Sequence, residues 1–300
     1  MSGEHLLQGT QMKYAFIAQQ QQEFPVKVLC QALSVSESGY YAWRKRPRSR
    51  RKQEDALLTQ EIHQVFEKNR KVYGSPRIHA ELRERGWHCG RKRIARLMRE
   101  QGISARKPRR RVCTTDSWHD DPVADNRLKR DFQAAEPNQE WVGDITGVPT
   151  AQGWLYLEVI VDLCSRLVVG WAMSMHRDET LVENALLMAL ARRSPPKGLL
   201  HHTDRGSQYT SQRYRALLEQ AGMQVSMSRR GNCYDNAPME SFFGSLKTEC
   251  VDGQNYRTPE EARRAIFEYL EVFYNRQRKH SSLGFVSPVV YEQLLREFST

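Results

Sequence analysis

The chain has 300 residues, a formal net charge of +11 and a pI near 9.5, a length sufficient for about two domains and a sizeable core. No apolar run approaches the roughly 18 residues of a membrane-spanning helix, and the N-terminal segment lacks the apolar stretch of a secretory signal. The six cysteines form no CxxC pair, which favours a reducing compartment over a zinc knuckle or a disulfide scaffold.

Positive charge is concentrated in residues 44–111, which carry 23 Lys and Arg against 7 Asp and Glu. This segment therefore has a net charge of +16, and the rest of the chain carries 11 − 16 = −5. Such a block is typical of proteins that bind a polyanion, and nucleic acid is the favoured partner. A membrane surface is disfavoured because no basic amphipathic helix presents a wide apolar face.

Residues 1–48 are predicted to form a helix-turn-helix-like segment. Phe24-Pro25 opens a first short helix, and Ser36 is the predicted N-cap of a second helix over 37–46. Two helices joined by a turn of three or four residues are typical of a helix-turn-helix.

Residues 49–109 predict a second, basic helix-turn-helix domain. Its helices are predicted over 54–68, from Ser75-Pro76 onward, and over 91–101. The outer face of the last of these helices carries five cations: Arg91, Lys92, Arg93, Arg96 and Arg99. We expect this face to contact DNA phosphates, although a solvated basic face is the simpler alternative.

Residues 110–136 are a predicted linker, and residues 137–257 a predicted α/β core. The linker is turn-rich and lacks apolar periodicity. In the core, three β-prone segments are followed by alternating helices and strands, in the order βββαβαβα. This order predicts a five-stranded mixed sheet flanked by helices, preceded by the all-α helix-turn-helix units. Residues 258–300 then predict a C-terminal helix, which begins at a capping box with Thr258 as the N-cap, and a basic tail.

Three acids stand at informative positions in this predicted core. Asp144 lies in the first strand, Asp204 ends the fourth strand, and Glu240 lies in the first turns of the last core helix. A lone acid at a strand end usually caps the next turn. Three convergent carboxylates, however, are ligands for Mg²⁺, and two such ions about 4 Å apart can clamp a phosphodiester. Without metal, the three acids would repel and raise one another's pKa values.

Several motifs resemble those of the DDE transposases and retroviral integrases. The stretches WVGDIT and HTDRGSQYTS precede GNCYDNAPMESFFGSLKTE, whose Glu240 follows Asp204 after 35 intervening residues. Four further stretches narrow the resemblance: VDLCSRLVVGWAM, SGYYAWRKR, YGSPRIHAELRERG and YNRQRKHSSLGFVSP. The chain is thereby identified as similar to the second-frame (OrfB) catalytic product of the IS-three family of bacterial insertion sequences, over roughly residues 24–292.

The resemblance implies an RNase H-like core in which Asp144, Asp204 and Glu240 bind two Mg²⁺ ions, with Mn²⁺ as a substitute. It implies cleavage at the element's ends by water, exposing a 3′-OH, and strand transfer by direct transesterification, of the copy-out, paste-in type. The implied partners are terminal-repeat and target DNA, further copies of the chain on DNA, and a zipper-containing first-frame protein or its fusion. The implied location is the bacterial cytoplasm, at the nucleoid.

Basic and polar residues around the acids are candidate DNA contacts. Lys247 lies seven residues after Glu240 and shares its helix face, where it is placed to hold a DNA phosphate. The other candidates lie in loops: Arg205, Gln208 and Tyr209 after the second acid, Arg229, Arg230 and Asn232 before the catalytic helix, and Arg276 and Arg278 in a basic loop near the end. The alternative for each is an ordinary solvated side chain.

Three other titratable residues near the predicted site have competing interpretations. Asp162 ends the second strand and is the rival metal ligand, but the resemblance places it outside the triad, which favours a structural role. The cap of the helix that carries Glu240 is predicted to be Asp235 or Asn236, with Asp235 favoured. His280 is a candidate general base, although a metal-activated water needs none.

Two alternative functions stay open at this point. An RNase H-fold nuclease that cuts without joining needs the acids but not two helix-turn-helix units. A non-catalytic DNA-binding regulator of transposition needs only the N-terminal third. A tyrosine or serine recombinase is disfavoured because the core has no activated nucleophile among clustered arginines.

Overall fold

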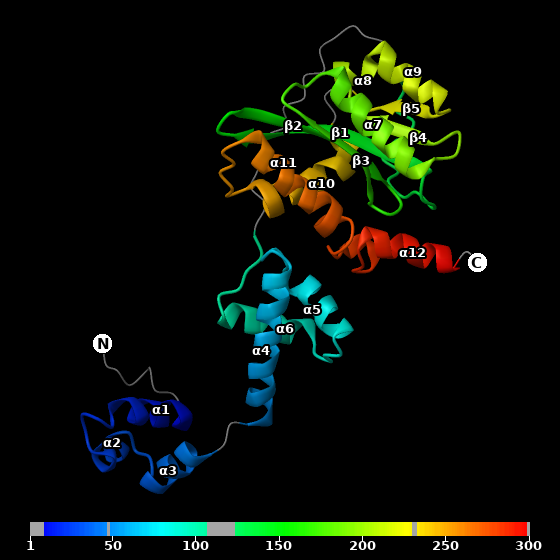
Figure 1. Cartoon of the computed structure of the whole chain (residues 1–300). Coiled ribbons are helices and arrows are strands. Elements are labelled where there is room, and N and C mark those ends of the chain that lie inside the picture. Colours follow the sequence, from blue (N-terminus) through cyan, green and yellow to red (C-terminus); the bar gives the residue numbers. More distant parts are fainter. Residues whose placement is uncertain (1–8, 47–48, 107–123, 230–232, 299–300) are drawn as a thin grey trace. The chain divides into compact units, whose positions relative to one another are not determined.

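The computed structural model describes residues 9–46, 49–106, 124–229 and 233–298 (Figure 1). The chain divides into two compact units, residues 1–60 and 61–300. No helix in these described ranges is both long and apolar enough to cross a membrane.

The first unit is a small helical assembly of α1 (Thr10–Gln20), α2 (Val26–Ala32) and α3 (Glu37–Lys45). The predicted N-cap is confirmed, because the Ser36 hydroxyl accepts a hydrogen bond of 3.1 Å from the Gly39 amide. Helix α1 was not predicted, because its apolar residues do not gather on one helical face. It contributes Tyr14 and Ile17 to the small core of this unit.

Helix α4 (Arg50–Lys68) spans the boundary between the units, and α5 (Ser75–Glu84) and α6 (Arg91–Glu100) follow within the second. Both short helices turn an apolar face inward, with Leu82 of α5 and Ile94 of α6 fully buried. The two helices contact each other, so the helical region predicted before the core is confirmed.

The centre of the second unit is a five-stranded mixed sheet in the order β3-β2-β1-β4-β5. Its strands are β1 (Glu140–Thr150), β2 (Gly153–Asp162), β3 (Val168–Ser174), β4 (Leu200–Thr203) and β5 (Gln224–Met227). The first three form an antiparallel meander, while β1 pairs with β4 and β4 with β5 in parallel. The predicted strand sequence and mixed sheet are confirmed.

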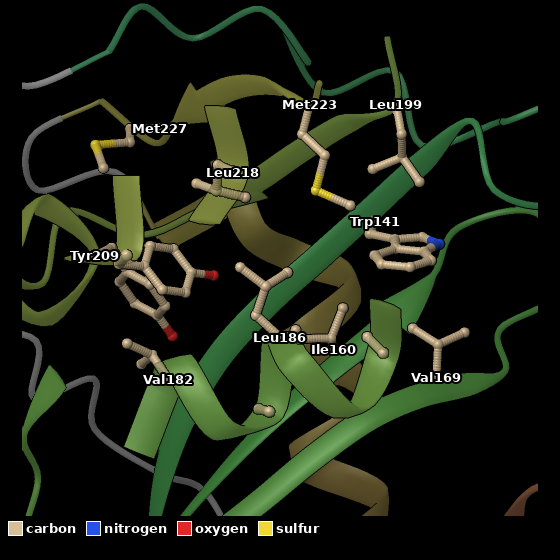
Figure 2. Packing of buried hydrophobic residues seen from close by; sticks show 13 residues of the cluster. Trp141, Ile160, Val169, Val182, Leu186, Leu199, Tyr209, Leu218, Met223 and Met227 are labelled. Carbon is tan, nitrogen blue, oxygen red and sulfur yellow. The ribbon is translucent and has the colours of Figure 1, made fainter. Parts of the chain in front are cut away.

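One face of the sheet packs against α7 (Glu179–Arg193), α8 (Ser207–Thr210) and α9 (Gln212–Gln220). Figure 2 shows Trp141 and Ile160 from the sheet beside Leu186 of α7 in this cluster. Because successive strand residues point to opposite faces, Asp144 faces away from the layer that contains Trp141. On that other side, α10 (Ala237–Leu246) contacts β1.

The remaining elements wrap around the core and lead to the C-terminus. Short 3₁₀ turns are formed by η2 (Cys233–Asn236) and η5 (Ser281–Leu283), and π-helical turns continue two helices as η3 (Lys247–Val251) and η4 (Glu268–Tyr274). Helix α11 (Pro259–Phe267) begins at the predicted cap, where the Thr258 hydroxyl accepts from the Glu261 amide at 3.2 Å. Helix α12 (Pro288–Phe298) ends the described chain.

Gly170 of β3 marks the closest approach of the sheet to α7. A Cβ at this position would collide with the Ala185 carbonyl oxygen and lie 2.7 Å from the Ala189 Cβ. We expect Gly170→Ala to lower the free energy of unfolding by about 1–3 kcal/mol through overpacking, measured by urea denaturation.

The matched control is Gly244→Ala on α10, where the added methyl group would meet no described atom within 4 Å apart from its chain neighbours and the backbone of its own helix. This helical site is expected to tolerate alanine or to gain up to about 1 kcal/mol. Equal effects of the two substitutions would contradict the tight packing of α7 on the sheet.

Candidate active site

The parallel pairing of β1 and β4 brings two of the predicted acids to one place. The register aligns Trp141 with His201 and Val142 with His202, so continuing it by two residues sets Asp144 alongside Asp204. Backbone amides orient both carboxylates: Asp144 Oδ1 accepts from the Ile145 amide at 2.8 Å, and Asp204 Oδ1 from the Gly206 amide at 2.9 Å.

The third predicted acid, Glu240, is exposed in the first turn of α10. Burial raises the pKa of Asp144 well above its usual range, and the charges of Asp204 and then of Glu240 raise it further. The three carboxylates therefore act on one another, although Arg177 partly offsets the effect on the pKa of Asp144.

The three predicted ligands are not drawn together around one point in this structure. Within the described parts of the chain, no three His, Cys, Asp or Glu side chains gather tightly enough to hold a metal ion. The donor set nevertheless fits a hard cation, because oxygen ligands of like charge that repel one another are drawn together by a divalent ion.

A buried acid that the sequence did not single out lies near this site, because the charges of Asp144 and Asp204 act on it. Glu158 on β2 is fully buried, and its Oε2 accepts a 2.7 Å hydrogen bond from the Tyr209 hydroxyl. Burial raises the pKa of Glu158 well above its usual range. The only available signal was one acid inside the apolar run of β2, WLYLEVIV.

The expectation that Tyr209 lines the DNA strand is wrong for this structure. Its side chain is buried in the core cluster, as Figure 2 shows, because the hydroxyl is satisfied by Glu158. Its neighbours in the same loop stay partly exposed: Gln208 donates to the Arg177 carbonyl at 3.1 Å, and Arg205 donates to the Ser228 carbonyl at 2.7 Å.

Asp235 does not cap α10, which corrects the predicted role. Asn236 occupies the N-cap position, and the buried Asp235 carboxylate accepts from Arg229 at 2.8 and 2.9 Å and from Arg130 at 2.8 Å. The hydrogen bonds from Arg229, ahead of those from Arg130, hold the pKa of Asp235 well below its usual range. Arg229 thus has an internal ion-pair partner, while Arg230 and Asn232 lie outside the described residues.

The rival acid Asp162 has the structural role that was favoured. It is fully buried and accepts hydrogen bonds from the Asn138 amide at 2.6 Å, the Trp141 indole at 3.2 Å and the Ser165 amide at 3.1 Å. These bonds tie the end of β2 to the start of β1.

Arg278 is not an exposed DNA contact, which corrects the second loop prediction. It is 3% exposed, and its Nε and Nη2 both donate to the Glu249 carboxylate at 2.7 Å. Arg276, by contrast, is exposed. Lys247 is partly exposed at the end of α10, where helical spacing places it on the Glu240 face.

The cations predicted on the helix-turn-helix lie at the surface of α6. Arg91, Lys92 and Arg99 are exposed, whereas Arg93 and Arg96 are partly exposed. Arg96 also pairs with Glu100 at 2.7 Å along the helix.

His201, a buried histidine of β4, should make the stability of the protein depend on pH. His201 is fully buried beside the Tyr214 hydroxyl at 2.7 Å, and burial lowers its pKa to about 3. The unfolded chain, in which a histidine pKa is about 6.5, therefore binds the proton first as the pH falls. Stability from this residue is lost between about pH 6.5 and pH 3, by about 1.4 kcal/mol per pH unit.

When the pH is lowered from 7 to 5, we expect the free energy of unfolding of the unchanged chain to fall by about 2 kcal/mol more than that of His201→Gln. Urea denaturation at both pH values measures this difference. The exposed His176→Gln is the matched control and should keep the original pH dependence. A His201→Gln curve parallel to that of the unchanged chain would contradict the assignment of a buried neutral imidazole.

Comparisons with known proteins agree with this architecture. Residues 134–233 and 240–294 match two families described as integrase core domains, and residues 52–111 match an HTH-like domain. The mixed sheet, the two integrase-core matches and the HTH-like match thus define a polynucleotidyl transferase with an RNase H-like integrase core.

The curated relatives narrow this class to a family. Transposase InsF for insertion sequence IS3A of Escherichia coli (strain K12) is 44% identical over 283 residues, covering 94% of this chain and 98% of that protein. An uncharacterized 31 kDa protein of insertion element IS600 from Shigella sonnei is 46% identical over 265 residues, covering 88% of this chain and 97% of that protein. The chain belongs to the family of the IS3 InsF transposases.

Solved structures with a similar arrangement include retroviral integrases. The simian T-cell lymphotropic virus intasome in complex with PP2A regulatory subunit B56 gamma matches with a TM-score of 0.45 and 20% identity, over 71% of this chain and 73% of that chain. The HTLV-2 integrase catalytic core domain in complex with magnesium matches with a TM-score of 0.42 and 18% identity, over 53% of this chain and 99% of that chain.

Proposed function

We propose that this transposase uses Asp144, Asp204 and Glu240 to bind two Mg²⁺ ions, cuts DNA at the ends of its insertion sequence, and joins the freed 3′-OH to another strand. The observation that supports the proposal is the parallel β1–β4 register, whose last pair, Val142 and His202, stands two residues before Asp144 and Asp204 on their respective segments. The raised pKa of Asp144, to which Asp204 and Glu240 both contribute, indicates excess negative charge at that point.

Each residue of the site has a separate task in this proposal. Asp144 and Asp204 are held by backbone amides and provide a rigid pair of oxygen ligands. Glu240 enters from α10 and closes the ligand set. When bound, the metal activates the attacking oxygen and stabilises the leaving oxygen of the phosphodiester. Lys247, on the Glu240 face of the helix, holds a DNA phosphate beside the ligands.

Water and then the DNA 3′-OH serve as nucleophiles, so no protein–DNA covalent bond forms. The transfer is a direct transesterification of the copy-out, paste-in type. The exposed cations of α6, together with Arg205, Gln208 and Arg276, contact DNA backbone phosphates and fix the position of the strands.

The proposed partners are terminal-repeat DNA, target DNA, further copies of this chain and the zipper-containing first-frame protein. An enzyme with bacterial DNA as its substrate works in the cytoplasm, at the nucleoid. The proposed domains are the segments 1–48, 49–109, 110–136, 137–257 and 258–300.

A strand-transfer assay tests the proposal. Pre-cut element DNA with a free 3′-OH is incubated with the full chain and Mg²⁺ or Mn²⁺, and joined products are separated on a denaturing gel. We expect joining that stops when the metal is chelated. Metal-dependent cleavage without joining would instead indicate a nuclease. DNA binding without chemistry, repeated with the first-frame fusion added, would indicate a regulator.

A further inference from the structure

A cleft of about 420 Å³ lies beside α10, away from the predicted metal ligands. Pro238, Ser241 and Ser245 line it from the helix, and helical spacing puts these residues on a different face from Glu240. The loop at Arg166 and the η5 turn form other walls. The catalytic helix is therefore shared between the metal-ligand side and this cleft.

The cleft carries more positive than negative charge. Three guanidinium groups line it, those of Arg77, Arg166 and Arg278. Their nearby carboxylate is Glu249, which binds Arg278 through two 2.7 Å bonds and lies 3.5 Å from Arg77 Nη1. Glu249 therefore pairs with two of the three arginines, and both of its oxygens already accept from Arg278.

Among the three lining arginines, Arg166 is the one without an ion-pair partner in the described residues. Its Nη2 donates to the Phe132 carbonyl at 3.0 Å, and within the described residues the guanidinium is paired with no carboxylate. A guanidinium has five N–H donors, so most of those of Arg166 remain for a ligand in the cleft.

The pKa of His280 is a second indication of excess positive charge in the cleft. Its ring lies in the cleft wall, and its Nε2 is 3.1 Å from Arg278 Nη1. Burial, followed by the charges of Arg278, Arg77 and Arg166, lowers the pKa of His280 to about 2. The imidazole is thus neutral, and the surroundings of the ring disfavour any additional cation.

The remaining polar groups on the rim are hydroxyls that can donate to an anion. Ser241, Ser281 and Ser282 are exposed at the cleft. Guanidinium forks and hydroxyl donors around one space match the oxygens of a phosphate group, for which arginine provides charge-assisted bonds. The volume also accommodates a nucleotide unit.

We infer that this cleft binds a phosphate group of a DNA strand. The inference rests on the proposed action on DNA and adds a second anchor, on the face of the catalytic helix that lies away from the metal ligands. A strand held there would be fixed relative to Glu240 through one rigid helix, because α10 carries both Glu240 and the Ser241–Ser245 wall.

Arginine-specific labelling tests this site directly. The full chain is treated with phenylglyoxal, and the modification rate of Arg166 is followed by peptide mass spectrometry. The arms are no ligand, inorganic phosphate, and duplex DNA. The background is Asp204→Asn, in which no joining is expected, so protection of the cleft is measured separately from catalysis.

We expect duplex DNA to slow modification of Arg166 by about tenfold, and millimolar phosphate to slow it less, since a bound anion shields the guanidinium. Ser282→Asp places a negative charge at the exposed rim and should abolish this protection. The control Ser38→Asp adds the same charge on the exposed surface of α3 and should retain it.

Equal labelling of Arg166 with and without DNA would overturn the inference, as would protection that survives in Ser282→Asp. Protection by inorganic phosphate but not by DNA would overturn the assignment to a DNA strand. Failure of strand transfer by the unchanged chain, combined with DNA protection that Ser282→Asp removes, would contradict the proposed function and leave this site intact.

Discussion

Asp204→Asn is expected to reduce strand transfer by about 10³-fold or more, equivalent to about 4 kcal/mol of lost transition-state stabilisation. The substitution keeps the size of the side chain and an oxygen that can accept from the Gly206 amide, so the loop after β4 should keep its shape. What it removes is one negative charge of the proposed ligand set, and with it the expected affinity of that site for the cation. The rate of product formation on pre-cut element DNA measures this loss.

Thermal unfolding gives a second readout that does not depend on catalysis. The proposed Mg²⁺ site exists only in the folded chain, so Mg²⁺ should raise the unfolding midpoint of the unchanged protein but not that of Asp204→Asn. Without metal, the variant should be at least as stable as the unchanged chain, because Asp204 raises the pKa of Asp144 and so disfavours its ionised form.

The exposed Asp131→Asn is the matched control and should preserve both activity and the response to Mg²⁺. An active Asp204→Asn enzyme, or one whose unfolding midpoint still rises with Mg²⁺, would remove Asp204 from the proposed ligand set.

Glu249→Gln is expected to lower the free energy of unfolding by about 3–5 kcal/mol, the usual cost of leaving a buried charge without its partner. Glu249 and Arg278 are 7% and 4% exposed at their side chains, and two 2.7 Å bonds join them. Glu249 also accepts from the Tyr269 hydroxyl at 2.9 Å and lies near Arg77. Neutralising this acid leaves the two arginines facing each other in a poorly solvated space, and chemical denaturation measures the cost.

An exposed ion pair provides the control for this second prediction. Arg50 and Glu54 lie 3.2 Å apart on α4, with side chains that are 94% and 45% exposed. Glu54→Gln should change stability by less than about 0.5 kcal/mol, because solvent screens such a pair. A similarly small effect of Glu249→Gln would show that its ion pair contributes no more than a surface contact.

Local features of the sequence were sufficient to predict most of the elements. The caps at Ser36 and Thr258 were correct because a cap depends on atoms only a few residues apart. The sequence of strands and helices in the core was also correct, since an apolar run or a helical period is a property of neighbouring residues. The prediction that Asp235 caps α10 was wrong. Its carboxylate instead accepts from Arg229, which is near in sequence, and from Arg130, which is far from it in sequence.

Surface and interior were harder to separate for polar residues in loops. Tyr209 and Arg278 both looked like candidate DNA contacts, since each lies in a polar stretch. Each is instead buried against an acid from another element, Glu158 for Tyr209 and Glu249 for Arg278. Burial of such a side chain depends on the position of its partner, which no local pattern records.

By itself, then, the sequence determined the order of the elements, the basic character of the helical region and the three acids through which the family resemblance was recognised. Only the tertiary structure decided that the charge of Asp204 acts on Asp144, that the buried Glu158 lies near both acids, and that three arginines line a cleft beside α10. The physical reason is that helix and strand patterns arise from neighbouring residues, whereas the register of β1 on β4 is set by the packing of whole faces.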